Sequence, residues 1–113
     1  MLYAVIGMLL GIDMGISGDH RLAPAHAHGL LLGWVSLFLA GVFFKLYPNE
    51  RGTIASAHWW IANAGVLVMV PGIGLIMLGA EGVGTPLASV GALVVLAGTL
   101  LFVGVVFRAT RHA

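Results

Sequence analysis

The side chains best suited to chemistry are those of His26 and His28, at the start of a long apolar stretch. An ionisable residue inside a membrane segment is costly and is a functional candidate by default. Helical positions i and i+2 point about 200° apart, so one metal ion cannot readily bind both rings. We expect each imidazole to face its own partner, on opposite sides of the helix.

The composition is that of a membrane protein. The chain has 113 residues, of which 60% are apolar and 8% are charged. It contains no cysteine, which excludes disulfides, thiolate metal ligands and thiol catalysis. The net charge of +1 is too small to indicate nucleic-acid binding. The first apolar run lacks a basic leader and a cleavage site, so we interpret it as a retained helix.

We predict a single all-α domain over residues 1–113, embedded in a lipid bilayer. The first of its four transmembrane helices is at the short limit for a hydrocarbon core of about 30 Å. The predicted helices cover about residues 2–17, 24–47, 56–79 and 86–107.

Local signals set the predicted helix ends. Thr85 and Pro86 suit an N-cap and a first helical turn, which leaves residues 81–85 as a tight loop. Ser56 suits another N-cap, and Pro71 predicts a kink in the middle of the third helix.

Small residues recur along one face of several predicted helices, and such faces let helix backbones approach closely. We therefore expect them to pack against neighbouring helices. The sets are Gly7, Gly11 and Gly15; Gly65, Gly72 and Gly79, whose spacing of seven begins at His58; and Gly84, Gly91 and Gly98.

Other polar residues have two interpretations each. Asp13 suits an interfacial carboxylate, or a hydrogen bond to a histidine ring or a water. His58 suits the headgroup level, or a ligand or proton-path role. Asn63 favours an interhelical hydrogen bond, and Trp59 and Trp60 favour interfacial anchors.

Four crossings would place both termini on one side, and the cations are distributed unequally between the two sides. By the positive-inside rule, both termini are cytoplasmic in a bacterial-type inner membrane, with His26 and His28 near the outer side. His58 would then lie near the inner side, which makes a three-histidine site within one chain improbable. Lys45, Arg51, Arg108 and Arg111 lie on the terminus side, and Arg21 lies on the other.

Three interpretations of the histidine pair remain open. The rings are interfacial and bonded to carbonyls or water; or they bind zinc or copper with Asp13 or His20; or each is an axial ligand of haem iron. Divergent rings disfavour the second and favour the third. Gly29 and Gly33 would leave an open strip for a flat macrocycle beside them.

The stretch of His26 and His28 followed by Gly33, Trp34 and a helix end at Pro48 resembles the tenth helix of subunit I in the haem-copper oxidase and nitric-oxide reductase superfamily. In that helix, the first histidine ligates the high-spin haem and the second ligates the low-spin haem. The whole chain resembles small four-helix proteins described as cytochrome c oxidase subunit I-like. Their later Ala-His-aromatic-Trp stretch corresponds to residues 57–60.

The resemblance implies one four-helix arc of a twelve-helix subunit, so a homotrimer would rebuild the barrel. His26 of one subunit and His28 of the next would then ligate a shared haem b. Copper is not expected from this chain alone, because its further histidine ligands are missing. Arg21, assisted by His20, would neutralise haem propionates or pair with Asp19. Trp34 would line a haem edge or face lipid.

We therefore predict an integral membrane b-type haem protein that acts in electron transfer, with an unidentified redox partner. A bis-histidine haem has no free coordination position for a gas. One alternative is a sensor or reductase-like haem protein that binds O2 or NO at an open iron. The other alternative is a structural subunit or small transporter without a cofactor.

Overall fold

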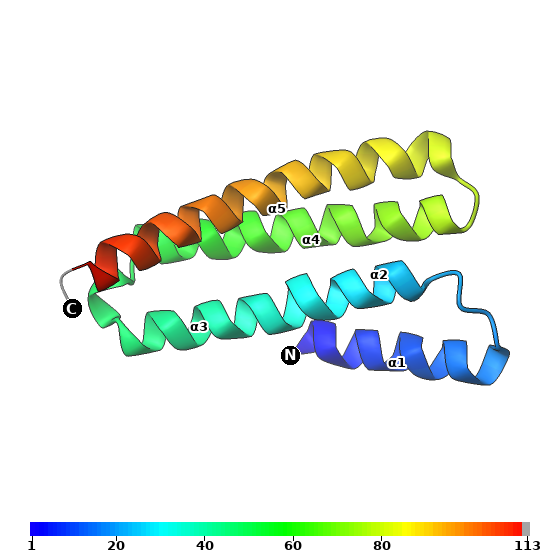
Figure 1. Ribbon diagram of the computed structural model, residues 1–113, viewed down its shortest axis with the longest axis horizontal. Helices are drawn as coiled ribbons and strands as arrows, with labels where there is room; N and C mark the ends of the chain where they lie inside the picture. The colour runs from blue at the N-terminus through cyan, green and yellow to red at the C-terminus, as the bar shows by residue number, and fades with distance from the viewer. Residues whose placement is uncertain (112–113) are drawn as a thin grey trace.

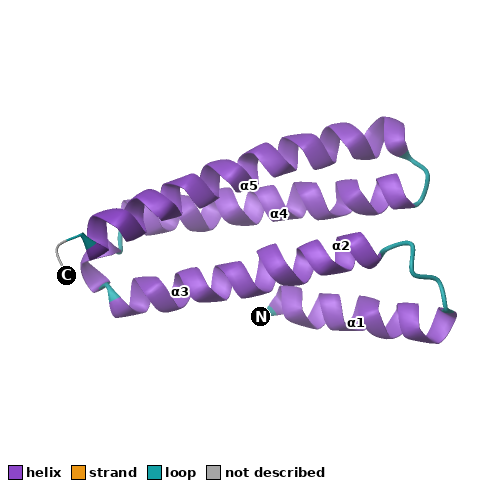
Figure 2. Cartoon of the chain, in the orientation of Figure 1, coloured by secondary structure: helices purple, strands orange, loops and turns teal. Residues whose placement is uncertain are grey.

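A computed structural model describes residues 1–111, and over this range the chain is helical with no strand (Figures 1 and 2). Residues 23–46 form one continuous helix, whose middle part is a π-helix. The elements are α1 (Leu2–Ser17), α2 (Ala23–His28), the π-helix η1 (Gly29–Val35), α3 (Ser36–Leu46), the 3-10 turn η2 (Pro48–Glu50), α4 (Thr53–Met77) and α5 (Glu81–Thr110).

Three helices are long and apolar enough to cross a membrane: α2–η1–α3 with 24 residues, α4 with 25 and α5 with 30. Helix α1 has 16 residues, or about 24 Å, which is shorter than a hydrocarbon core of about 30 Å. Its first residues lie beside the middle of α2–η1–α3, whereas α5 ends beside the turn between α3 and α4 (Figure 1). The start of α1 and the end of α5 thus lie at different positions along the length of the bundle (Figure 1).

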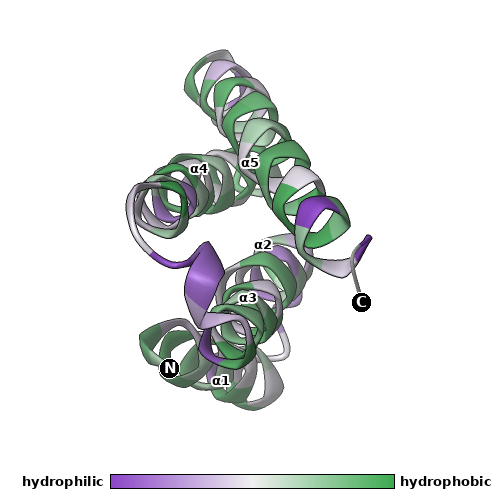
Figure 3. Ribbon diagram, turned by 90° about the vertical axis from the view of Figure 1, so that its left-hand side faces the viewer, coloured by the Kyte–Doolittle hydropathy of each residue, from purple (hydrophilic) through white to green (hydrophobic). Residues whose placement is uncertain are grey.

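The helices form two pairs, α1 with α2–η1–α3 and α4 with α5 (Figure 3). Apolar residues cover the outside of every helix, and the turn after α3 is hydrophilic. Such an exterior suits a lipid environment. A small buried cluster lies where α3, α4 and α5 meet; it contains Ala40, Phe44 and Val105, with Phe43, Ile54, Ala55 and Phe102 packed against it.

Glycine faces bring the backbones of α4 and α5 into contact, as the spacing predicts. A Cβ added at Gly72 would lie 2.5 Å from the backbone nitrogen of Ala88. A Cβ added at Gly91 would lie 2.6 Å from the Cα of Met69. Gly79 is the exception in its set, because it follows α4 with a φ of +93° and belongs to the turn.

The last helix begins earlier than the sequence predicts. Residues 81–85 form the first turn of α5 instead of a loop, the N-cap is Ala80, and Pro86 lies inside the helix. Packing against α4 explains the extension, because Gly84 is buried and a Cβ there would lie 2.7 Å from the carbonyl oxygen of Gly72. The negative charge of Glu81 also suits the N-terminal turn.

The ends of α4 differ as well. It begins at Thr53 after Gly52, whose φ of +111° places it in the region that favours glycine. Ser56 therefore lies within the first turn and does not cap the helix. Pro71 lies inside α4.

Candidate functional site

Each ring of the histidine pair is held by a backbone carbonyl. Nδ1 of His26 lies 2.8 Å from the carbonyl oxygen of Gly7 in α1. Nδ1 of His28 lies 2.7 Å from the carbonyl oxygen of Pro24, one turn back in α2. A carbonyl oxygen only accepts hydrogen bonds, so Nδ1 carries the proton in both rings. In the neutral form of either ring the lone pair is therefore on Nε2, the nitrogen left to act as a base or a metal ligand.

The two rings face different surroundings. His26 is half-buried against α1, where a Cβ added at Gly11 would lie 3.1 Å from Cε1 and 3.7 Å from Nε2. His28 is exposed. Because α1 lies against the ring of His26, His28 is the more accessible of the two imidazoles in a single chain.

The open strip expected beside the histidines is filled at Gly33. A Cβ added there would lie 2.7 Å from the ring of Tyr3, because α1 packs on this face of η1. At Gly29, Val70 of α4 lies at an ordinary contact distance of 3.8 Å. These glycines therefore pack helices together within the chain, a use of small residues that the prediction of a macrocycle site did not include.

An apolar pocket of about 180 Å3 lies beside His26, between α1, α2 and α4. Cofactor and drug-sized ligands occupy pockets of about 300–1,000 Å3. A flat macrocycle would therefore have to bind on the outer face of the helices, where His28 is exposed. The donor set fits such a group, since each imidazole presents Nε2 with Nδ1 already hydrogen-bonded.

The π-helix η1 directly follows His28, and it is a feature that the sequence analysis missed. The backbone N–H of Ser36 bonds to the carbonyl oxygen of Leu31, five residues back, as in a π turn, and the hydroxyl of Ser36 donates to the same oxygen at 2.8 Å. Short π segments are frequent at functional sites. Trp34 lies within η1 and is partly exposed at the surface of the chain.

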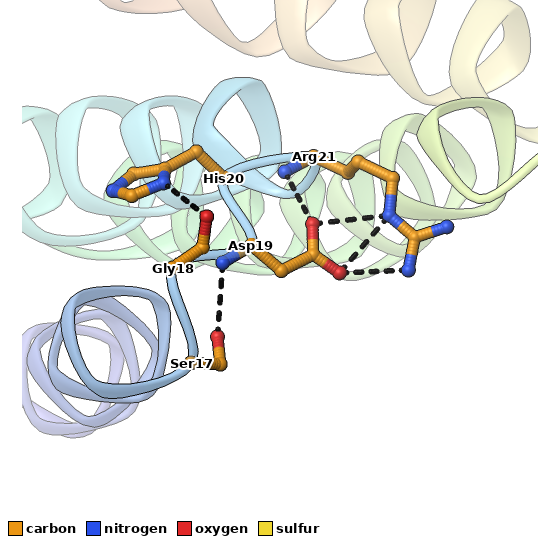
Figure 4. Close-up of polar contacts among 5 residues, drawn as sticks. All are labelled: Ser17, Gly18, Asp19, His20 and Arg21. Carbon is orange, nitrogen blue, oxygen red and sulfur yellow. Dashed lines mark hydrogen bonds and ion pairs between the residues drawn. The ribbon is translucent and has the colours of Figure 1, made fainter.

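The loop before the pair is organised by an ion pair (Figure 4). Nη2 of Arg21 lies 2.7 Å from Oδ2 of Asp19, and Nε donates to both carboxylate oxygens at 3.0 Å. These hydrogen bonds lower the pKa of Asp19 to about 2. Nδ1 of His20 bonds to the carbonyl oxygen of Gly18 at 3.0 Å. Arg21 thus pairs with Asp19 in the single chain, the second of its two predicted roles.

Asp13 and Asn63 are two further polar candidates, and their surroundings differ. Asp13 is exposed and makes no hydrogen bond to a histidine within residues 1–111. Asn63 accepts a hydrogen bond from the hydroxyl of Tyr3 at 2.8 Å, which confirms the predicted interhelical bond. The sequence analysis missed Tyr3, since nothing local marks a tyrosine near the chain start as the partner of α4.

His58 lies at the opposite end of the bundle, enclosed between aromatic rings. The centroid of its ring is 5.1 Å from that of Phe102 and 6.0 Å from that of Phe44. Its side chain is buried, with 7% of the residue exposed. In the described part of the chain no three histidine, aspartate or glutamate side chains come together as a metal site.

Comparison with known protein families, curated proteins and solved structures found no match for this chain. The resemblance to oxidase subunit I therefore rests on the residues of the second and third predicted helices.

Proposed function

We propose that this chain is an integral membrane b-type haem-binding protein that acts in electron transfer, with His26 and His28 as the axial ligands. The observation that carries the proposal is the pair of Nδ1–carbonyl hydrogen bonds. Histidines that bind metals usually donate the other ring N–H to a carbonyl or carboxylate, which fixes the tautomer and raises the basicity of Nε2. Bound haem would supply one-electron redox chemistry.

The ligand pair is shared between subunits in this proposal. The rings have different partners, and the pocket beside His26 is too small for a macrocycle, which together favour one imidazole from each of two chains. A homotrimer of four-helix arcs would place His28 of one subunit opposite His26 of the next. The apolar outer faces of the helices are suited to such contacts as well as to lipid.

Arg21 would bind a haem propionate. It lies in the exposed loop before α2, where its guanidinium already binds a carboxylate in bidentate fashion. If a haem propionate took the place of the Asp19 carboxylate beside Arg21, the charge of Arg21 would stay paired. Trp34, whose ring is partly exposed, would border the haem, whereas Gly29 and Gly33 would act indirectly, by letting α4 and α1 pack closely beside the histidine pair.

The proposed orientation places the histidine pair near the outer side of a bacterial-type inner membrane. The cations at the opposite end of the bundle, around the turn between α3 and α4, support this assignment through the positive-inside rule. Those near this turn and at the end of α5 are Lys45, Arg51, Arg108 and Arg111.

Ligand substitution tests the assignment. The variants His28→Ala and His26→Ala should each abolish or alter the low-spin haem spectrum of the full-length protein in detergent. His58→Ala is the control, because this histidine lies at the opposite end of the bundle with its ring between those of Phe44 and Phe102. An unchanged low-spin spectrum in both helix variants would exclude them as axial ligands.

The unequal exposure of the two imidazoles favours a second candidate function. If α1 keeps His26 from the iron, His28 alone would ligate the haem and the other axial position would bind O2 or NO. Carbon monoxide added to the reduced protein distinguishes the two candidates. A bis-histidine haem should bind it poorly, whereas a five-coordinate haem should bind it readily.

A further inference from the structure

A basic pocket lies at the end of the bundle opposite the histidine pair. It has a volume of about 450 Å3 and lies between α3 and the start of α4. The cationic side chains of Lys45 and Arg51 line it, together with Ser56 and Trp59. No acidic side chain lines it.

The charges in this pocket are not compensated by the protein. Nε of Arg51 donates to the carbonyl oxygen of Phe44 at 2.9 Å, and this bond orients the guanidinium without neutralising it. Within residues 1–111, neither Arg51 nor Lys45 forms an ion pair. The nearby carboxylate of Glu50 is already paired with Arg108.

The N-terminus of α4 adds to the positive potential. Its N-cap is Gly52, which has no side chain to bond the N–H groups of the first turn. Of the first turn, Ala55 borders the pocket, and Ser56, whose N–H bonds to the carbonyl oxygen of Gly52, follows it there. The combination of two cations and a helix N-terminus suits a phosphate group.

An apolar hollow of about 570 Å3 continues from the basic pocket. The two share Leu37, Gly41 and Trp59, so they form one groove along α3 and α4. The hollow lies between the first residues of α1 and the facing parts of α3 and α4, because α1 begins beside the middle of the long helix and does not run on along α3 (Figure 1). Apart from Asn63 its lining side chains are apolar or aromatic.

We propose that this groove binds an anionic phospholipid. The phosphate interacts with Lys45 and Arg51, and one acyl chain lies in the apolar hollow past Leu37 and Gly41. A headgroup at a basic pocket between transmembrane helices and a chain in the adjoining hollow together match both parts of the groove. A phosphate ion would use only the basic part, and a zwitterionic lipid would gain little from the two cations.

Fluorescence quenching of Trp59 tests the proposal, because this residue borders both parts of the groove. In a Trp34→Phe, Trp60→Phe background, Trp59 is the single tryptophan. The full chain is placed in phosphatidylcholine vesicles that contain either brominated phosphatidylglycerol or brominated phosphatidylcholine at the same mole fraction. The brominated phosphatidylglycerol should quench Trp59 at a several-fold lower mole fraction.

Three variants separate the groove from general surface charge. Lys45→Gln should reduce the preference for phosphatidylglycerol about fivefold, the factor expected for one cation at the membrane surface. Arg111→Gln removes a charge from the same end of the bundle but outside the groove, and should change the preference less. Gly41→Leu should reduce quenching by both lipids, since it fills the groove at a position with open space around it.

Four results would overturn the proposal. The first is equal quenching of Trp59 by the two brominated lipids. The second is an equal effect of Lys45→Gln and Arg111→Gln on the lipid preference. The third is shielding of Trp59 from both lipids, which would indicate a second copy of the chain in the groove. The fourth is loss of the preference when inorganic phosphate is added at constant ionic strength, which would indicate a site for free phosphate. Each variant is compared at the same haem content, because bound haem would itself quench Trp59, so the ratio of quenching by the two lipids tests the groove separately from the haem proposal.

Discussion

Substitution of Gly91 by alanine should push α4 and α5 apart and lower the stability of the helix bundle. The added Cβ would lie 2.6 Å from the Cα of Met69, where carbon atoms in ordinary contact are about 3.5–4.0 Å apart. The shortfall is about 1 Å, and backbone atoms on both sides leave no flexible side chain to absorb it. Overpacking of this kind costs about 1–3 kcal/mol.

Gly104→Ala is the matched control, because Gly104 is in the same helix and has open space around it. Both substitutions gain the same intrinsic helix stability of about 0.5–1 kcal/mol, so the difference between them measures the contact alone. Unfolding is followed by circular dichroism as sodium dodecyl sulfate is titrated into mild-detergent micelles. We expect Gly91→Ala to unfold at lower sodium dodecyl sulfate than Gly104→Ala. Equal midpoints would refute the inference that the α4–α5 backbones touch at Gly91.

Three further predictions concern single side chains. Tyr3→Phe removes the hydrogen bond to Asn63 and should cost about 1 kcal/mol of unfolding free energy in the same titration, with α1 the first helix to lose amide protection. The Asp19–Arg21 pair should persist above about pH 4 and be lost as the pH falls towards 2, because the pKa of Asp19 is lowered in the folded chain; a carboxyl NMR titration of Asp19 measures this. His58→Ala should lower stability, since the buried ring packs between aromatic side chains, yet leave any haem spectrum unchanged.

The close packing of α4 on α5 was predictable because it depends on a repeating pattern within the chain. Gly65 and Gly72 recur seven apart, and so do Gly84, Gly91 and Gly98, so each set lies on one helix face. A face without Cβ atoms has one main use in an apolar helix, which is contact with another backbone. The same local reasoning predicted the bounds of α1 at Leu2 and Ser17.

Contacts between distant residues set the features that were not predictable. The local sequence of residues 81–85 predicts a loop before Pro86, but this segment is helical because Gly84 packs on α4. The ring of Tyr3 fills the space beside Gly33, which no spacing within either helix indicates. The π-winding of η1 likewise has no signature in its residue types.

The candidate site was predictable in part. His26 and His28 are recognisable because imidazoles are rare in an apolar helix, and their divergence follows from helical geometry. The carbonyl partner of His26 was not predictable, since Gly7 belongs to another helix, whereas the carbonyl oxygen of Pro24 lies one turn before His28 in the same helix. The burial of His58 was also hidden, because the aromatic rings that enclose it come from α3 and α5.

The absorption spectrum of the protein, purified in detergent from haem-replete cells, tests the central claim most directly. The spectrum is recorded oxidised and then after reduction with dithionite. We predict a sharp reduced α-band typical of low-spin haem b, which is lost in His28→Ala and retained in His58→Ala. A colourless protein would contradict the account and favour a structural or transport role without a cofactor.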